Sequence, residues 1–287
     1  MAATTTNAPG WAFGNAVLVT IDIEIHCRKH YPKVGSPQDR VSEVGVASFD
    51  PHRVRFADAG DRAKNTWGSI KACNFAITEN THILGEGSHA RHCRDRHWAL
   101  GPDAGVKATD FDFGKLYNVS RVHVKKAFVN KIRTLLGDHP PFKTDTPYHN
   151  NREVVFLFFD QHNDLRWLQS LDINLLVEFP NSRIVDIQRG PLAAAIGKHM
   201  RGKDKISAED LYKYLRFETV HMHNGGNDAV WELRAYLAEL TLTDPQTHKT
   251  RIPDEASTLN KDGVVVKEEP TYIAAPEVIV DGEVWEL

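Results

Sequence analysis

The feature that most constrains this chain is an uninterrupted aliphatic run near its start, Asn15-Ala-Val-Leu-Val-Thr-Ile-Asp-Ile-Glu24. A run of this kind, rich in β-branched residues, is typical of a strand at the centre of a sheet that helices cover on both faces. A chain of 287 residues is long enough to bury such a sheet. The run therefore predicts an α/β domain.

The rest of the chain predicts both strands and helices. Apolar runs indicate strands at 43–50, 54–57, 154–159 and 183–188, and near-helical spacing indicates helices at 122–136, 164–176, from Ser207 onward and at 229–240. Strands that come first and then alternate with helices are typical of an α/β sheet with a hairpin at one side.

Composition divides the chain into three parts. We expect a flexible leader at 1–15, one domain at 16–240 with a long insertion at about 60–150, and an acidic tail at 241–287. Within the tail, Asp281-Gly282 between apolar alternations predicts a terminal hairpin. The tail is also a candidate contact for a protein partner.

Cysteine usage and hydropathy favour an intracellular protein, in the cytoplasm or the nucleus. Three scattered cysteines are too few for a disulfide framework and indicate a reducing compartment. No apolar run approaches the roughly 18 residues that span a membrane. The first 16 residues carry no charged side chain, so neither a secretory signal nor a transit peptide is predicted. The oligomeric state is not predictable from these features.

The formal net charge of −3 does not exclude a nucleic-acid substrate. The tail holds four Lys or Arg against ten Asp or Glu, so the residues before it carry a net charge of +3. Residues 84–133 alone hold ten Lys or Arg against five Asp or Glu. We therefore expect a mildly basic domain whose nucleic-acid affinity depends on metal and salt.

Acidic residues at three separate places suggest a metal site. Asp22 and Glu24 leave the same face of the first strand, because side chains two apart on a strand point the same way. Asp164 and Asp228 each begin a predicted helix, where an acid can also be a simple cap. Oxygen ligands from several elements suit Mg²⁺ or Mn²⁺, and two such ions can clamp the oxygens of a phosphodiester.

A histidine accompanies the last of these acids. In His223-Asn-Gly-Gly-Asn-Asp228, two glycines permit a tight loop that folds the imidazole back beside the carboxylate. Imidazole gains and loses a proton near neutral pH, so it can take the proton from an attacking water.

These segments together resemble the exonuclease motifs of the DEDDh 3′–5′ exonucleases. The order Asp-Ile-Glu24, Glu43-Val-Gly-Val-Ala, Asn163-Asp-Leu-Arg-Trp-Leu168 and His223-Asn-Gly-Gly-Asn-Asp-Ala is similar over roughly residues 15–240. The resemblance extends to a fungal branch that includes a quelling-associated exonuclease. It implies a ribonuclease-H-like mixed sheet flanked by helices, and a two-metal mechanism.

Carried onto this chain, the resemblance makes four acids metal ligands and His223 the general base. The four are Asp22, Glu24, Asp164 and Asp228. The second motif departs from the family pattern, because Phe159-Asp160 stands where a Gly-His is usual and is one residue shorter before Asn163-Asp164. This departure could re-aim the site or mark lost activity.

The segment 85–97 offers a competing site. Its His89, His92, Cys93 and His97 have the chemistry of zinc ligands, but structural zinc sites usually draw on two separated pairs, and zinc is not predicted. We expect instead a basic loop that contacts phosphates through Arg91, Arg94 and Arg96.

The predicted helix at 122–136 adds Lys125 and Lys126 as candidate nucleic-acid contacts. Charged runs on helices are more often solvated faces. Beside a phosphodiester site, these lysines would track the backbone of the substrate.

The sequence therefore predicts a metal-dependent 3′–5′ exonuclease that acts on single-stranded ends, RNA more than DNA. The alternative is a catalytically inactive ribonuclease-H-like scaffold that binds nucleic acid or a protein partner. That scaffold would bind oligonucleotides without turnover, in the presence of EDTA and after loss of His223.

Overall fold

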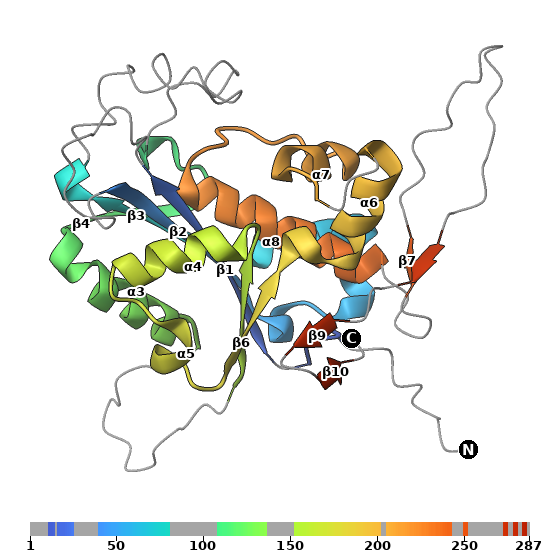
Figure 1. The fold of residues 1–287 in the computed structure, drawn as a ribbon, viewed down its shortest axis with the longest axis horizontal. Helices are drawn as coiled ribbons and strands as arrows, with labels where there is room; N and C mark the ends of the chain where they lie inside the picture. The colour runs from blue at the N-terminus through green and yellow to red at the C-terminus, as the bar shows by residue number, and fades with distance from the viewer. Residues whose placement is uncertain are drawn as a thin grey trace.

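A six-stranded mixed sheet organises the computed structural model, with strand order β4-β3-β2-β1-β5-β6 (Figure 1). The structure describes residues 11–14, 16–25, 40–80, 108–136, 152–201, 205–242, 249–251, 272–274, 278–280 and 283–285. The strands of the sheet are β1 (Val17–Ile25), β2 (Val41–Phe49), β3 (Lys71–Ile77), β4 (Gly114–Val119), β5 (Val154–Phe158) and β6 (Ser182–Asp186). Strand β2 is antiparallel to β1 and β3, and the other pairs are parallel.

Strand β1 lies inside the sheet between β2 and β5, as its aliphatic run predicts. Its side chains alternate between two separate cores. Val19 and Ile21 enter one core, while Leu18 enters the other. Because both faces of the strand are buried, uninterrupted apolar residues are what the position requires.

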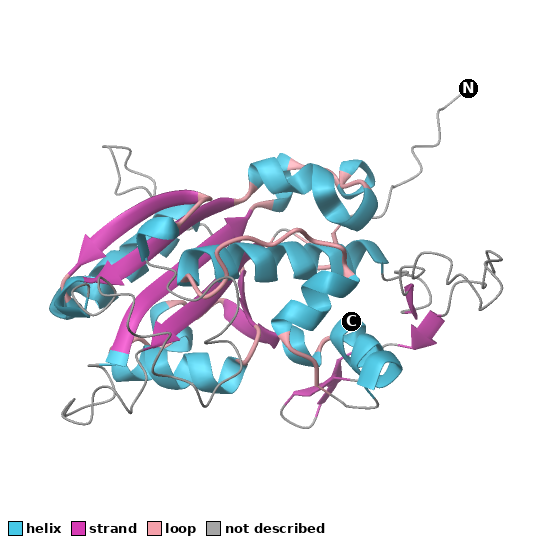
Figure 2. Cartoon of the chain, turned by 90° about the horizontal axis from the view of Figure 1, so that it is seen from above, coloured by secondary structure: helices cyan, strands magenta, loops and turns pink. Residues whose placement is uncertain are grey.

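Helices cover both faces of the sheet (Figure 2). One core contains residues of α3 (Arg121–Leu136), α4 (Gln161–Ser170) and the short α5 (Leu175–Glu178). The other contains residues of α6 (Pro191–Arg201), α7 (Ala208–Tyr214) and α8 (Gly225–Leu242). Every residue of α8 from Gly225 to Glu239 is buried, and this helix packs on β1, β2 and β3 (Figure 1). The predicted α/β fold with a mixed, helix-flanked sheet is confirmed.

The third predicted strand, at 54–57, is wrong. These residues lie at two 3₁₀ turns, Pro51–Arg53 and Phe56–Asp58. The Asp50 carboxylate accepts a hydrogen bond from the His52 amide, and Pro51 supplies the fixed φ that suits the start of a turn. The strand that pairs with β2 is β3, further along the chain.

The predicted helix at 164–176 is two helices. The chain leaves α4 after Ser170, and Asp172 adopts a left-handed φ of 61°, which a continuing helix does not allow. Asn174 then caps α5 by accepting from the Val177 amide. The strand predicted at 183–188 likewise ends at Asp186, because its carboxylate accepts from the Gln188 amide and begins a 3₁₀ turn.

The span from 60 to 150 contributes two strands of the sheet, β3 and β4, and helix α3. Near the C-terminal end of the predicted leader, Trp11 and Phe13 are buried and stack on each other. The Trp11 indole donates to the Val54 carbonyl. The described part of residues 1–15 is thus anchored in the core. In the tail, β7 (Lys249–Arg251) pairs with β8 (Tyr272–Ala274), and β9 (Val278–Val280) with β10 (Glu283–Trp285).

Candidate active site

The first two acids lie near the end of β1, on the face that α8 covers. In the register with β2, Asp22 lies opposite Gly45 and Glu24 lies opposite Glu43. The pairing shifts between Glu24 and Ile25, so the regular strand pairing becomes irregular just after the second acid. A glycine opposite Asp22 leaves room above the strand, and α8 occupies that room.

The start of α8 approaches β2 with no space for a side chain between them. A Cβ on Gly45 would lie 1.8 Å from the Gly225 carbonyl oxygen and 2.5 Å from the Gly226 nitrogen. Gly225 and Gly226 are therefore the first turn of α8 rather than the loop that we predicted. The close contact brings Asp228, also in the first turn, next to the acids of β1.

The residues that lead into α8 adopt strained backbone conformations. Arg216, His221 and His223 have φ values of 54°, 47° and 67°. Non-glycine residues rarely adopt such angles, and surrounding structure must hold them there. The buried Asn227 does so in part, because its side-chain amide donates to the carbonyls of Asp110 (2.9 Å) and His221 (3.1 Å).

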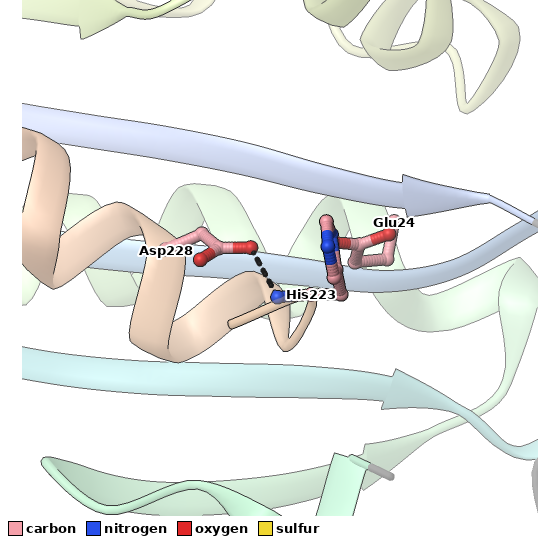
Figure 3. Close-up of side chains that lie close together, drawn as sticks. All are labelled: Glu24, His223 and Asp228. Atoms are coloured by element: carbon pink, nitrogen blue, oxygen red, sulfur yellow. Dashed lines mark hydrogen bonds between the residues drawn. The ribbon is translucent and has the colours of Figure 1, made fainter. Parts of the chain in front are cut away.

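His223 and Asp228 are joined directly. The backbone amide of His223 donates to Asp228 Oδ2 at 2.9 Å, and Figure 3 shows the imidazole beside Glu24. One ligand atom from each of Glu24, His223 and Asp228 lies within 4.8 Å of the others, so these three could share a metal ion. The imidazole is exposed, whereas Asp228 is buried.

Asp164 reaches the same cluster from the other side of β1. Strand β5 ends at Phe158, Asp160 precedes α4, and Asp164 is a buried acid in the first turn of that helix. Burial raises the pKa of Asp164, and the charges of Asp160, Glu24 and Asp186 raise it further. Burial and the charge of Asp164 in turn raise the pKa of Asp22. The shortened second motif therefore still brings its aspartate to the other acids.

Burial dominates the electrostatics of these four acids. It raises the pKa of each carboxyl well above its ordinary value, and the negative charges of the neighbouring acids raise these pKa values further (Asp22, Glu24, Asp164 and Asp228). Asp22 Oδ2 and Asp228 Oδ1 are buried, and no described residue forms a hydrogen bond with either oxygen. Unpaired buried carboxylate oxygens of this kind are what divalent cations neutralise, so the donor set fits Mg²⁺ or Mn²⁺.

Glu43 is a buried acid beside the site that our sequence reasoning did not single out. Its Oε2 accepts from Asn74 Nδ2 at 2.6 Å and from the Gly225 amide at 3.3 Å, which links β2, β3 and the start of α8. Burial raises the pKa of Glu43 to about 7. The sequence contained a signal for Glu43, because it precedes Gly45 by two residues and both positions therefore lie on the same face of the strand.

Glu232 is a second acid that we did not predict. It lies one helical turn after Asp228, is 3% exposed, and has a pKa raised by burial and by the charges of Asp22, Asp164 and Asp228. The sequence offered a signal for Glu232, because an Asp and a Glu four residues apart on a predicted helix lie on the same face of that helix. Asp186 at the end of β6 pairs with Arg189 at 3.3 Å and is only partly buried.

The candidate nucleic-acid contacts divide into two groups. Arg91, Arg94 and Arg96, with the whole segment 85–97, lie outside the described residues. Lys125 forms ion pairs with Asp172 (3.0 Å) and Glu178 (3.2 Å) on α3's side of the sheet, opposite α8. Lys126 is exposed on the same helix. The structure thus does not bring Lys125 to the acid cluster.

Three further findings concern the chain as a whole. No helix among the described residues is long and apolar enough to cross a membrane. Comparison with protein families matches residues 17–239 to the family model DEDDh_C, described as DNA polymerase III subunit epsilon-like, C-terminal domain. No curated protein matches the chain.

Proposed function

The chain belongs to the DEDDh exonuclease family, and from this premise we propose that it is a metal-dependent 3′–5′ exonuclease acting on single-stranded nucleic-acid ends. One observation carries the proposal: Glu24 and Asp228 have ligand atoms close to His223, and Asp22 and Asp164 interact electrostatically with Glu24. Caps or solvated faces would not need four interacting acids, two of them buried and two half-buried. The family assignment makes nuclease chemistry the natural use of such a cluster.

In the proposed reaction, His223 is the general base. Its imidazole takes the proton of the water that attacks the terminal phosphodiester, and the leaving 3′ oxygen departs on the opposite side of the phosphorus. The hydrogen bond from its backbone amide to Asp228 holds the histidine beside the acids. The exposed position of the ring lets a substrate end reach it.

The four acids would hold two Mg²⁺ or Mn²⁺ ions. When bound, such ions supply positive charge that stabilises the attacking and the leaving oxygens. The protein's part is to keep the carboxylates close together in a buried place, where they remain costly until cations neutralise them. The fit is supported by the unpaired oxygens of Asp22 and Asp228.

The finer assignments rest on the resemblance of the motifs. We propose membership of the fungal branch that includes a quelling-associated exonuclease, and with it a preference for RNA over DNA. We also propose that the acidic tail at 241–287 contacts a protein partner and that the protein works in the cytoplasm or the nucleus. A matched pair of RNA and DNA oligonucleotides tests the preference, because only RNA offers a 2′-hydroxyl.

The experiment measures release of mononucleotides from a 3′-labelled single-stranded oligonucleotide with Mg²⁺, and with EDTA in its place. We expect labelled mononucleotide to appear first with wild type and Mg²⁺, and none with Asp22→Ala. Equal degradation by wild type and Asp22→Ala would overturn the proposal. Oligonucleotide binding without turnover, unchanged by EDTA, would instead support the inactive scaffold.

A further inference from the structure

Glu232 is a buried glutamate for which the proposed reaction has no use so far. It lies in the middle of α8, one turn beyond Asp228, so both side chains share a face of the helix. Only 3% of Glu232 is exposed, and within the described part of the chain its Oε2 has no hydrogen-bond partner. Burying an unpaired carboxylate is expensive, which makes its presence at this position informative.

A second buried glutamate of the same helix has a hydrogen-bond donor and serves as a comparison for Glu232. Glu239 is also buried, but its Oε2 accepts a hydrogen bond from the Leu192 amide at 3.1 Å, and it packs against Gly190. The protein thus provides a donor for one buried glutamate of α8. For Glu232 Oε2, no described residue provides one.

The surroundings of Glu232 are acidic. The charges that act on it come from Asp22, Asp164, Asp228 and Asp186, in that order of strength. Among the described residues, no Lys or Arg forms an ion pair with it. Besides burial, the charges of three of the four acids that the proposed function assigns to the metal ions therefore raise the pKa of Glu232, and among the described residues no cationic side chain pairs with it.

We propose that Glu232 is a fifth carboxylate of the cation site and that its negative charge strengthens cation binding at Asp22 and Asp228. The inference rests on the proposed function, because it takes those residues as the cation ligands. It gives a reason for an unpaired acid at this place in α8, since bound cations would neutralise its charge. A carboxyl that merely fills space between α7 and α8 would have no effect on cation affinity.

The test compares Mn²⁺ binding by the full chain after EDTA treatment and removal of the chelator. Free Mn²⁺ is followed by its electron paramagnetic resonance signal during titration of wild type, Glu232→Gln and Glu239→Gln. Glutamine keeps the size of the side chain and removes its charge. We expect Glu232→Gln to weaken Mn²⁺ binding by about 10-fold or more, the range typical of groups that support metal ligands, and Glu239→Gln to bind as wild type does.

Two further variants separate the possible failures. Asp22→Asn should lose Mn²⁺ binding, so wild-type binding by both Asp22→Asn and Glu232→Gln would overturn the proposed function itself. If Asp22→Asn loses binding while Glu232→Gln keeps wild-type affinity, the inference about Glu232 alone is wrong. Glu232→Asp keeps the charge and should bind more tightly than Glu232→Gln. Equal affinity of these two variants would also overturn the inference, and the Mn²⁺-induced rise in Tm gives a second readout on folded protein.

Discussion

A single methyl group at Gly45 should disturb the site more than its size suggests. In the structure, a Cβ at this position would lie 1.8 Å from the Gly225 carbonyl oxygen and 2.0 Å from its carbon. Both are backbone atoms, so no side-chain rotation relieves the overlap. Bringing the Cβ to 3.0 Å from the oxygen requires the start of α8 to move away from β2 by about 1.2 Å.

This displacement reaches the acids directly, because the first turn of α8 carries Asp228. Glu24, His223 and Asp228 have ligand atoms within 4.8 Å of one another, and a shift of Asp228 alone spreads them. A misplacement of about 1 Å can cost roughly 100-fold in rate. We therefore expect Gly45→Ala to lower kcat/KM about 100-fold and to weaken Mn²⁺ binding, with a loss of about 1–3 kcal/mol in the free energy of unfolding.

The assay is mononucleotide release from a labelled single strand, together with urea unfolding and the Mn²⁺ titration. Gly68→Ala is the matched control, since a Cβ at Gly68 meets no atom within 4 Å. The two variants add the same methyl group, and we expect Gly68→Ala to keep wild-type activity. Folded Gly45→Ala with the activity and cation affinity of Gly68→Ala would refute the reasoning.

Two other perturbations test the chemistry and the core. Burial raises the pKa of Glu239 from an ordinary 4.5 to about 8. The protonated Glu239 therefore stabilises the folded protein fully below pH 4.5, and this contribution to the free energy of unfolding is lost as the pH rises to about 8. Between pH 5 and pH 9, wild type should lose about 4 kcal/mol more than Glu239→Gln in urea unfolding with EDTA present, and parallel pH profiles would contradict this. His223→Ala should lower kcat by about 10²- to 10⁴-fold with little change in KM. His52 is an exposed histidine, and His52→Ala should leave kcat unchanged. A His223→Ala enzyme with normal kcat would exclude the histidine as the base.

The sheet was predictable where strands are buried on both faces. The runs at β1, β2 and β5 are rich in aliphatic and aromatic residues, and this pattern predicted each of them within a few residues. Strand β3 was missed because Lys71 and Asn74 interrupt its apolar pattern. Asn74 is buried all the same, since it donates to Glu43. A hydrogen bond across 31 residues leaves no trace in local periodicity.

The site was predictable from residue types and their spacing, but its packing was not. The motif order singled out the four acids and His223, and the structure places ligand atoms of Glu24, His223 and Asp228 within 4.8 Å of one another; the catalytic and metal-binding roles of the five residues stay predictions. The role of Gly225 and Gly226 was misjudged, because two adjacent glycines usually indicate a turn. Here they begin a helix, and its first residues pack so closely on β2 that Gly45 has no room for a side chain. That contact joins residues 180 positions apart, and only the folded chain reveals it.

The acids come from opposite ends of the domain, with Asp22 on the first strand and Asp228 on the last long helix. A chain that stops before α8 can contain every strand of the large sheet and still lack both Asp228 and His223. The four acids and His223 are therefore all in place only when α8 packs against β1 and β2. Under the proposed function, synthesis from the N-terminus would complete the nuclease site only after the last long helix of the domain has been made.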